Sequence, residues 1–164
     1  MPKLRVGVLF GGRSAEHEVS LVSATGIMRA LDTSRYVVVP IGIAPDGRWL
    51  TGQSALRLLK ERADLRGIPE HIFVPDPRKQ GLVPVRRSTR HVGVDVVFPV
   101  LHGTFGEDGT IQGLLELADI PYVGAGVLGS AVGMDKVIQK QLLRQAGIPV
   151  ATAVWFNGAE YRRT

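Results

Sequence analysis

Residues 94–113, VDVVFPVLHGTFGEDGTIQG, decide the fold of this 164-residue chain. Residues 94–100 are mostly apolar and rich in valine, which predicts a buried strand. Three glycines then fall within residues 103–109. The apolar residues after this turn recur at the spacing of a helix: Ile111, Leu114, Leu115 and Ala118. The stretch therefore predicts a strand, a glycine-rich turn and a helix, in that order.

The N-terminal residues repeat this order. Residues 4–10 predict a buried strand, residues 11–14 (GGRS) a loop, and residues 19–31 a helix with apolar residues on one face. A second run of strand-forming residues covers positions 36–43. The opening of the chain therefore predicts a strand, a helix and a second strand.

The middle of the chain predicts a hairpin, a helix and an irregular insertion. Pro45-Asp46-Gly47 is a turn signal, so a short returning strand is expected at residues 48–50. Residues 54–62 predict a helix. Residues 67–90 are rich in proline, glycine and charge, and we expect an irregular segment there with short strands at most.

The C-terminal third predicts a short strand at residues 120–123, tightly packed backbone in the glycine-rich residues 124–133, and a helix after them. Asp135 is a typical N-cap for that helix, and Gly147 is typical of its end. Its apolar stripe contains Met134, Ile138 and Leu142. Residues 150–156 predict a new strand, which we interpret as the beginning of another domain.

The alternation of strands and helices predicts an α/β fold, a mostly parallel sheet with helices on both faces. We expect one domain over residues 1–149 and the truncated start of a second domain over residues 150–164. Ligands of such sheets bind beyond the carboxyl ends of the strands. The glycine turns at residues 11–14 and 103–109 follow strands, so they should line one cleft.

The composition is that of a folded, water-soluble protein, with 45% hydrophobic and 21% charged residues. The absence of cysteine excludes disulfides and thiolate metal sites and is what a cytoplasmic protein would have. No apolar run approaches the ~18 residues of a membrane span, and the N-terminus does not resemble a signal peptide. The net charge of +5 is dispersed along the chain and has no aromatic platform beside it, which argues against a nucleic-acid partner.

Glu16 and Glu18 lie at the start of the first predicted helix, just after two glycines. Acidic residues are common at this position because they interact favourably with the helix dipole. The alternative is that Glu16 faces the cleft and holds a substrate ammonium group. The local pattern favours the helix-dipole role and leaves the second one open.

His102 directly follows a predicted strand and precedes a loop that is short of side chains. A lone histidine is more often structural, but this position makes contact with a ligand at least an even alternative. Glu107 and Asp108 have the character of helix caps, and we prefer that role for Asp108. None of the other histidines, which are His17, His71 and His91, has the spacing of a metal site.

Residues 124–129, GAGVLG, match the glycine pattern of dinucleotide-binding loops. That pattern normally follows the first strand and has an acidic residue about 20 positions further on, which this chain lacks. We therefore interpret these glycines as sites of close helix packing. A nicotinamide-dependent oxidoreductase remains a weaker hypothesis.

Lys136 lies in the first turn of a predicted helix, where a positive charge is mildly unfavourable unless an anion is nearby. Asp135 could be that anion, which would make the lysine structural. A bound phosphate is the alternative, because a helix N-terminus and an ammonium group together suit one. The sequence leaves these two interpretations level.

Taken together, residues 11–20, 102–113 and 122–136 resemble the D-alanine:D-alanine ligase family, an ATP-grasp family of cell-wall synthesis. The middle block, H-G-x-x-G-E-D-G-x-x-Q-G, is a signature of that family. The resemblance implies a Rossmann-like pre-ATP-grasp domain over residues 1–149 and the truncated start of the central ATP-grasp domain over residues 150–164.

The resemblance also implies residue roles. Glu16 corresponds to a catalytic glutamate that holds the ammonium group of the first D-alanine, Val19 to an apolar neighbour of its methyl group, and His102 to a histidine near the same substrate. Lys136 corresponds to a lysine that reaches the ATP phosphates. The Mg²⁺ ligands of the family correspond to no residue of this chain, so no metal site is expected here.

The family's reaction is the ligation of two D-alanines for peptidoglycan, driven by ATP with Mg²⁺ through an acyl phosphate. The resemblance implies a cytoplasmic homodimer whose partners are D-alanine and ATP, with no membrane or nucleic acid. A D-alanine:D-lactate ligase domain and a non-catalytic binding or dimerisation module remain alternatives. We expect the chain to be an N-terminal fragment that is inactive by itself.

Overall fold

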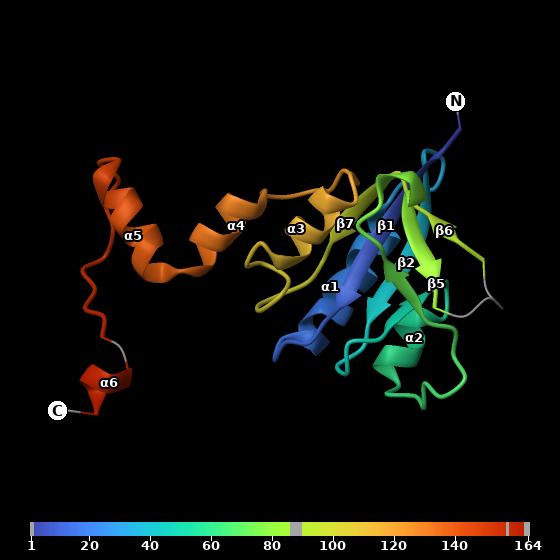
Figure 1. Cartoon of the computed structure of the whole chain (residues 1–164), viewed down its shortest axis with the longest axis horizontal. Helices are drawn as coiled ribbons and strands as arrows, with labels where there is room; N and C mark the ends of the chain where they lie inside the picture. Colours follow the sequence, from blue (N-terminus) through green and yellow to red (C-terminus); the bar gives the residue numbers. More distant parts are fainter. Residues whose placement is uncertain (1, 86–89, 157, 163–164) are drawn as a thin grey trace.

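The computed structural model of the chain describes residues 2–85, 90–156 and 158–162. Its body contains a seven-stranded sheet and three α-helices, and three further α-helices lie in the segment that extends away from it (Figure 1). The elements of the body are β1 (Leu4–Gly11), α1 (His17–Ala30), β2 (Tyr36–Ile43), β3 (Trp49–Thr51), α2 (Ala55–Lys60), β4 (His71–Phe73), β5 (Gly81–Pro84), β6 (Val92–Gly93), β7 (Val96–Pro99) and α3 (Thr110–Leu117). A short 3₁₀ helix, Pro77–Lys79, lies between β4 and β5.

The sheet is mixed, with the strand order β6-β5-β4-β3-β2-β1-β7. β1 pairs in parallel with β2 and with β7, and these three strands form one half of the sheet. The strands β3 to β6 extend the other half with antiparallel pairings. The expected α/β fold is confirmed, and the parallel strands are β1 and β7, which lead to the two glycine turns, and β2 beside β1.

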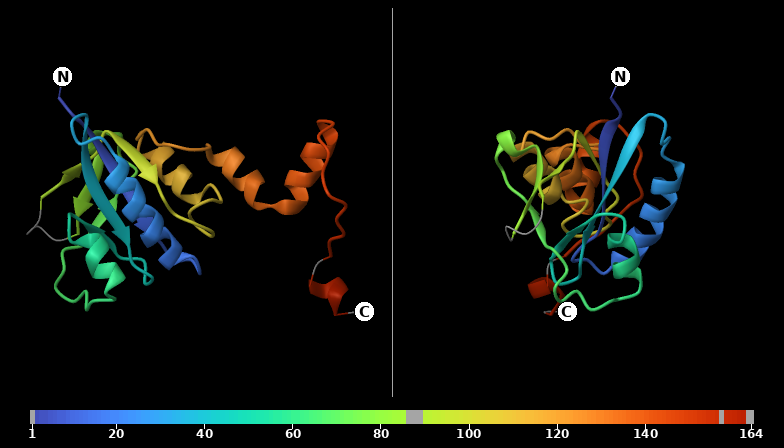
Figure 2. Two further views of the ribbon diagram at one scale, coloured as in Figure 1. Left: turned by 180° about the vertical axis from the view of Figure 1, so that it is seen from behind. Right: turned by 90° about the vertical axis from the view of Figure 1, so that its right-hand side faces the viewer.

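Helices cover both faces of the sheet, as expected (Figure 2). On one face, α1 and α2 pack Leu21 and Leu59 against a core that includes Phe10 of β1. On the other face, α3 packs Ile111 and Leu115 against the second core cluster. β1 contributes side chains to both clusters because successive residues of a strand point to opposite faces.

The strand predicted over residues 94–100 is shorter than expected. Residues 92–93 pair with β5 and residues 96–99 pair with β1, so the chain changes partner between them. At this bend Asp95 accepts hydrogen bonds from the backbone nitrogen of Arg5 at 2.7 Å and from its Nη2 at 2.6 Å. The bend therefore fastens the start of β7 to the start of β1.

The segment after α3 also differs from expectation. The strand expected at residues 120–123 is reduced to a parallel bridge between Tyr122 and Val97 of β7. The tight packing expected of residues 124–133 is wrong: in α4 (Val127–Met134) only Ser130 is buried among the residues that the structure describes. A side chain at Gly124 or Gly133 would meet open space. The glycines therefore do not mark close helix packing.

The helix expected after Asp135 is confirmed as α5 (Lys136–Gln145). The Asp135 carboxylate accepts hydrogen bonds from the backbone nitrogens of Val137 and Ile138, both at 3.0 Å, and Gly147 has the left-handed φ of +74° that suits a helix end. The strand expected at residues 150–156 is absent from this described segment. The helix α6 (Gly158–Tyr161) follows.

The helices α4 and α5 and the residues after them form an arm that extends from the body (Figure 1). The expected apolar stripe of α5 is exposed on this arm rather than packed in a core; its members are Met134, Ile138 and Leu142. Among the described residues, no helix has the length and apolar character needed to cross a bilayer.

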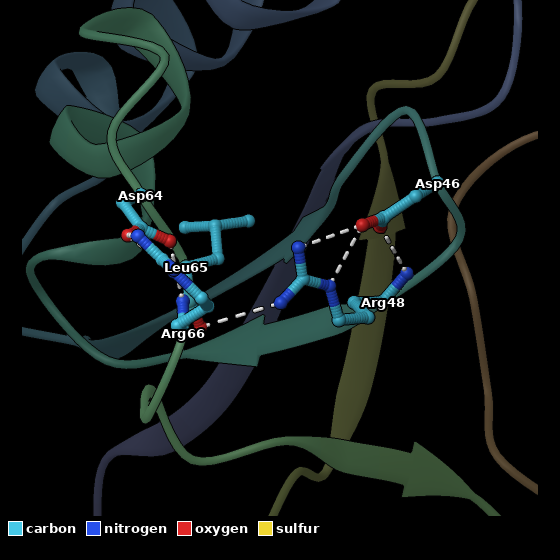
Figure 3. Close-up of polar contacts among 5 residues, drawn as sticks. All are labelled: Asp46, Arg48, Asp64, Leu65 and Arg66. Carbon is cyan, nitrogen blue, oxygen red and sulfur yellow. Dashed lines mark hydrogen bonds and ion pairs between the residues drawn. The ribbon is translucent and has the colours of Figure 1, made fainter.

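Three arginines of the body each pair with an aspartate two positions earlier, an arrangement that we call the Asp-x-Arg clip. Figure 3 shows the clips of Arg48 and Arg66. The pairs are Asp46 with Arg48, Asp64 with Arg66 and Asp76 with Arg78. In each clip the arginine donates both a backbone and a side-chain hydrogen bond, and these bonds hold the pKa of the carboxyl below its usual value. Arg48 also donates to the carbonyl of Leu65 at 3.3 Å, which connects the β2–β3 hairpin to the loop after α2.

Candidate functional site

The first loop of the site connects β1 to α1. Gly11 and Gly12 have φ values of +87° and +102°, which favour glycine, and a Cβ at Gly11 would overlap the carbonyl oxygen of Ile43. His17 is buried beside them, and its Nδ1 lies 2.9 Å from the carbonyl oxygen of Gly12. Because a carbonyl only accepts, Nδ1 of His17 must carry the proton. This histidine therefore fixes the loop that leads to Glu16.

Ser20 joins this loop to the end of β7. Its hydroxyl accepts a hydrogen bond from the backbone nitrogen of Gly11 at 2.8 Å and donates one to the carbonyl oxygen of Val100 at 2.5 Å. The side chain is fully buried, so water cannot replace either partner. One hydroxyl thus sets the distance between the carboxyl ends of β1 and β7.

Ser14 makes a second connection between the two glycine loops. Its hydroxyl donates to the carbonyl oxygen of His102 at 2.7 Å and accepts from the backbone nitrogen of Glu16 at 3.0 Å. Glu16 and His102 are 86 positions apart in the sequence, yet a single side chain holds both of their backbones. The expectation that the two glycine turns lie together is confirmed.

The imidazole of His102 is half-buried, and its Nε2 lies 3.1 Å from the hydroxyl of Ser23 on α1. The neighbouring Glu107 accepts a hydrogen bond from the backbone nitrogen of Gly103 at 2.7 Å. This bond turns the Glu107 carboxylate back toward the loop instead of toward the helix that follows it. Capping of that helix, which the sequence left open for Glu107 and which we preferred for Asp108, is therefore not the role of the Glu107 carboxylate.

Asp108 has the structural role that was expected of it. Its carboxylate accepts hydrogen bonds from the backbone nitrogens of Thr110 at 3.0 Å and of Phe105 at 2.9 Å. Burial disfavours the charged form, but these hydrogen bonds outweigh it and hold the pKa of Asp108 below its usual value. The aspartate stabilises the start of α3 and the loop before it.

Glu16, His102 and Glu107 come together at the edge of the sheet. One ligand atom from each, a ring nitrogen and two carboxylate oxygens, lie within 4.8 Å of one another. Both glutamates are exposed, so a soluble ligand can reach them. Two carboxylates beside an imidazole can bind a cationic group such as an ammonium ion, and they favour its charged form.

A cavity of about 670 Å³ adjoins this group, and we call it the cleft. His102, Glu107 and Lys136 all line it, although they belong to different parts of the chain. Gln112 lines it as well; it is buried, its Nε2 donates to the carbonyl of Gly106 at 3.0 Å, and its Oε1 has no partner among the described residues. The cleft therefore combines charged groups with a residue whose buried amide oxygen has no hydrogen-bond donor among the described residues.

The role of Lys136, structural or phosphate-binding, remains a prediction. One oxygen of the Asp135 carboxylate, Oδ1, accepts hydrogen bonds from two backbone nitrogens of α5, and no ion pair joins the carboxylate to Lys136 in the described part of the chain. The ammonium group of Lys136 instead donates to the carbonyl of Gly133 at 2.8 Å and is exposed. The lysine is thus available to an anion in the cleft.

The role of Val19 remains a prediction. It lies on the first turns of α1, about half exposed, and it is not among the residues that line the cleft. The serines Ser14, Ser20 and Ser23 were missed by sequence reasoning. Serines are common in a loop and at the start of a helix, so these three form no distinctive pattern. The residues that they bind lie 79 to 88 positions away in the sequence.

An α/β domain that gathers carboxylates, an imidazole and a lysine around a cleft beyond its parallel strands belongs to the class of small-molecule-binding enzyme domains. The comparison with known families is specific. Residues 5–125 match the family described as the D-ala D-ala ligase N-terminus. The chain belongs to this family.

Individual relatives agree with the family match. The chain is 50% identical to the D-alanine–D-alanine ligase of Natranaerobius thermophilus and 48% identical to that of Corynebacterium diphtheriae, in alignments that cover 99% and 97% of the chain. These alignments cover 45% of each relative, so the chain spans a little under half of their length.

Solved structures give the same result for the fold. The chain is similar to the VanG D-Ala:D-Ser ligase from Enterococcus faecalis, with a TM-score of 0.84 and 35% identity over 99% of this chain and 47% of that one. It is also similar to the D-alanine-D-alanine ligase from Coxiella burnetii, with a TM-score of 0.78 and 37% identity over 98% of this chain and 49% of that one.

Proposed function

We propose that this chain forms the first-substrate half of an ATP-dependent ligase that joins two D-alanines. The observation that carries the proposal is the meeting of Glu16, His102 and Glu107 within 4.8 Å, beside a cleft that Lys136 also lines. The family membership supports it, because relatives with about half of their residues identical to this chain are D-alanine–D-alanine ligases.

In the proposed mechanism Glu16 pairs with the ammonium group of the first D-alanine. This pairing directs the substrate carboxylate into the cleft, toward His102, and Val19 is proposed to contact the methyl group. A carboxylate oxygen of D-alanine attacks the γ-phosphorus of ATP, ADP leaves, and an acyl phosphate forms. The amine of the second D-alanine then attacks the carbonyl carbon, inorganic phosphate leaves, and a proton is released from the nitrogen.

The residues described here supply one contact for the nucleotide, the ammonium group of Lys136. Mg²⁺, which would neutralise the phosphates of ATP, prefers six oxygen ligands in an octahedron. The group of Glu16, His102 and Glu107 does not fit this preference, because one of its ligand atoms is an imidazole nitrogen. We therefore assign no Mg²⁺ ligand to these residues and derive no step through the metal.

D-Alanine is the second substrate that we propose, because relatives that are 48–50% identical to the chain are named D-alanine–D-alanine ligases. The resemblance to a D-Ala:D-Ser ligase shows that related domains serve a different second substrate, so D-lactate or D-serine remains an alternative. We further propose a homodimeric, cytoplasmic ATP-grasp enzyme of peptidoglycan synthesis, in line with the family resemblance.

The test is steady-state kinetics of the complete enzyme with Glu16→Gln. Loss of a charge-assisted hydrogen bond costs about 1.5–3 kcal/mol, so kcat/KM for D-alanine should fall at least about tenfold while the KM for ATP changes little. Glu18→Gln is the matched control, because Glu18 lies two positions away and its carboxylate pairs with Arg62 at 3.1 Å. Equal effects of the two substitutions, or unchanged use of D-alanine, would refute the assignment.

A further inference from the structure

A second cavity of about 400 Å³ lies behind the cleft, and we call it the rear pocket. Leu101, His102 and Gly106 line both cavities, so the loop of residues 101–106 is the wall between them. The rest of the rear pocket is formed by the β1 loop, by the β2–β3 hairpin and by α3. Its apolar wall consists of Ile43, Trp49, Leu101, Ile111 and Leu114.

Arg13 lies across the rim of this pocket. Its guanidinium carbon is 5.3 Å from the centre of the Phe105 ring, which is a cation–π arrangement. The aliphatic part of Arg13 packs on the hairpin turn, since a Cβ at Gly47 would lie 3.2 Å from the Arg13 Cδ. Phe105 itself has a φ of +66°, a left-handed conformation that is unfavourable for an aromatic residue. The loop thus holds the ring beneath the arginine despite this strain.

Apart from the cation–π contact of Arg13 with Phe105, two polar groups at the rim, the guanidinium group of Arg13 and the hydroxyl of Thr104, have no polar partner among the described residues. Arg13 makes no ion pair with any residue that the structure describes, in contrast to Arg5, Arg48 and the other paired arginines. Thr104 lines the pocket, and its hydroxyl makes no hydrogen bond within the described part of the chain, whereas the side chain of Thr110 is hydrogen-bonded to Asp108. One cation and one hydroxyl therefore border an apolar hollow.

From this arrangement we propose that the rear pocket is a second ligand site, for a small monocarboxylate with an aromatic or branched apolar body. The apolar body would pack against Trp49, Ile111 and Leu114. The carboxylate would accept hydrogen bonds from the guanidinium group of Arg13, whose planar fork matches carboxylate geometry, and from the hydroxyl of Thr104. Apolar walls with a few convergent polar groups are typical of small-molecule sites. The proposal goes beyond the ligase function and does not depend on it.

The test uses the fluorescence of Trp49. The chain has two tryptophans, and Trp155 is exposed on the arm, so Trp155→Phe leaves Trp49 as the single reporter. This protein is titrated with 4-tert-butylbenzoate and, in parallel, with the neutral 4-tert-butylbenzamide. We expect a saturable change in Trp49 emission with the carboxylate and at least about threefold weaker binding of the amide, the size of effect that a partly exposed ion pair contributes.

Two substitutions locate the carboxylate. Arg13→Gln should weaken benzoate binding at least about threefold and leave amide binding unchanged. Arg35→Gln is the matched control, because Arg35 is also exposed and its guanidinium carbon lies 5.5 Å from the ring centre of Tyr36, outside both cavities. Arg35→Gln should leave both ligands unaffected.

The proposal would be overturned if the benzoate gave no saturable signal up to about 10 mM, because binding weaker than that corresponds to less than about 3 kcal/mol. Equal binding of the benzoate and the benzamide would overturn it as well. So would equal effects of Arg13→Gln and Arg35→Gln on benzoate binding. Weakening by Lys136→Gln would also overturn it, because it would place the carboxylate in the cleft. Failure of the rear pocket leaves the D-alanine kinetics of Glu16→Gln untouched, so the two proposals are tested separately.

Discussion

Replacement of Ser20 by alanine should destabilise the protein more than the removal of one oxygen atom suggests. The hydroxyl is fully buried and satisfies both the backbone nitrogen of Gly11 and the carbonyl oxygen of Val100. Alanine would leave both groups buried without a partner, and each such loss costs about 1–3 kcal/mol. We therefore expect a loss of about 2–6 kcal/mol in the free energy of unfolding, a large part of the ~5–15 kcal/mol that a domain of this size has.

Urea unfolding followed by far-ultraviolet circular dichroism measures this loss. Ser23→Ala is the matched control on the same helix, because its hydroxyl is only partly buried and has one partner, Nε2 of His102. Ser23→Ala should cost about 1 kcal/mol or less, with the same dependence on urea concentration as the wild type. If the two variants lose equal stability, the bridge between β1 and β7 does not have the energetic role derived from the structure.

Three further predictions concern charge and ATP. In the complete enzyme, Lys136→Ala should raise the KM for ATP without lowering the melting temperature. Asp135→Ala should instead lower the melting temperature, because it removes an N-cap worth about 1 kcal/mol. If Lys136→Ala lowers the melting temperature and leaves the KM for ATP unchanged, the lysine is structural. Hydrogen bonds from Arg5 lower the pKa of Asp95, so the stabilisation is present above the carboxyl's unfolded pKa and is lost as pH falls through the lower folded pKa. The free energy of unfolding should therefore fall less steeply with decreasing pH in Asp95→Asn than in the wild type. The difference should be about 1 kcal/mol or less, because solvent screens this partly exposed pair. Parallel curves for the two proteins would contradict this expectation. Finally, calorimetry of this 164-residue chain should give a Kd for ATP no tighter than about 1 mM, because one exposed lysine contributes little binding energy; micromolar binding or steady phosphate release would overturn that expectation.

Sequence patterns predicted the body well because its signals are local and strong. Residues 36–43 form β2 with the expected bounds, since five of the eight residues are valine or isoleucine and favour a strand even with Pro40 and Gly42 among them. Asp135 and Gly147 marked the ends of α5 correctly through their capping chemistry. The meeting of Glu16 with His102 also followed, because both come after parallel strands, which end at the same edge of the sheet.

The role of Glu107 could not be predicted, because it and Asp108 are adjacent acids before one helix. Only the fold of the loop decides that Asp108 caps α3 while Glu107 turns back to the nitrogen of Gly103. The prediction of close packing at the glycines of residues 124–133 was wrong for a related reason. Glycine permits close packing, but whether a neighbour uses the space depends on tertiary structure, and at Gly124 and Gly133 none does.

The separation between body and arm has a consequence for the order of events during synthesis. All seven strands precede residue 100, and the last segment that completes the sheet edge is the bridge at Tyr122. The body can therefore fold as soon as Val123 has left the ribosome. At about 5–20 residues per second the next 40 residues take roughly 2–8 seconds to appear, far longer than a small domain commonly needs to fold. The arm thus emerges from a body that is already formed, with its apolar residues still exposed to water and to chaperones.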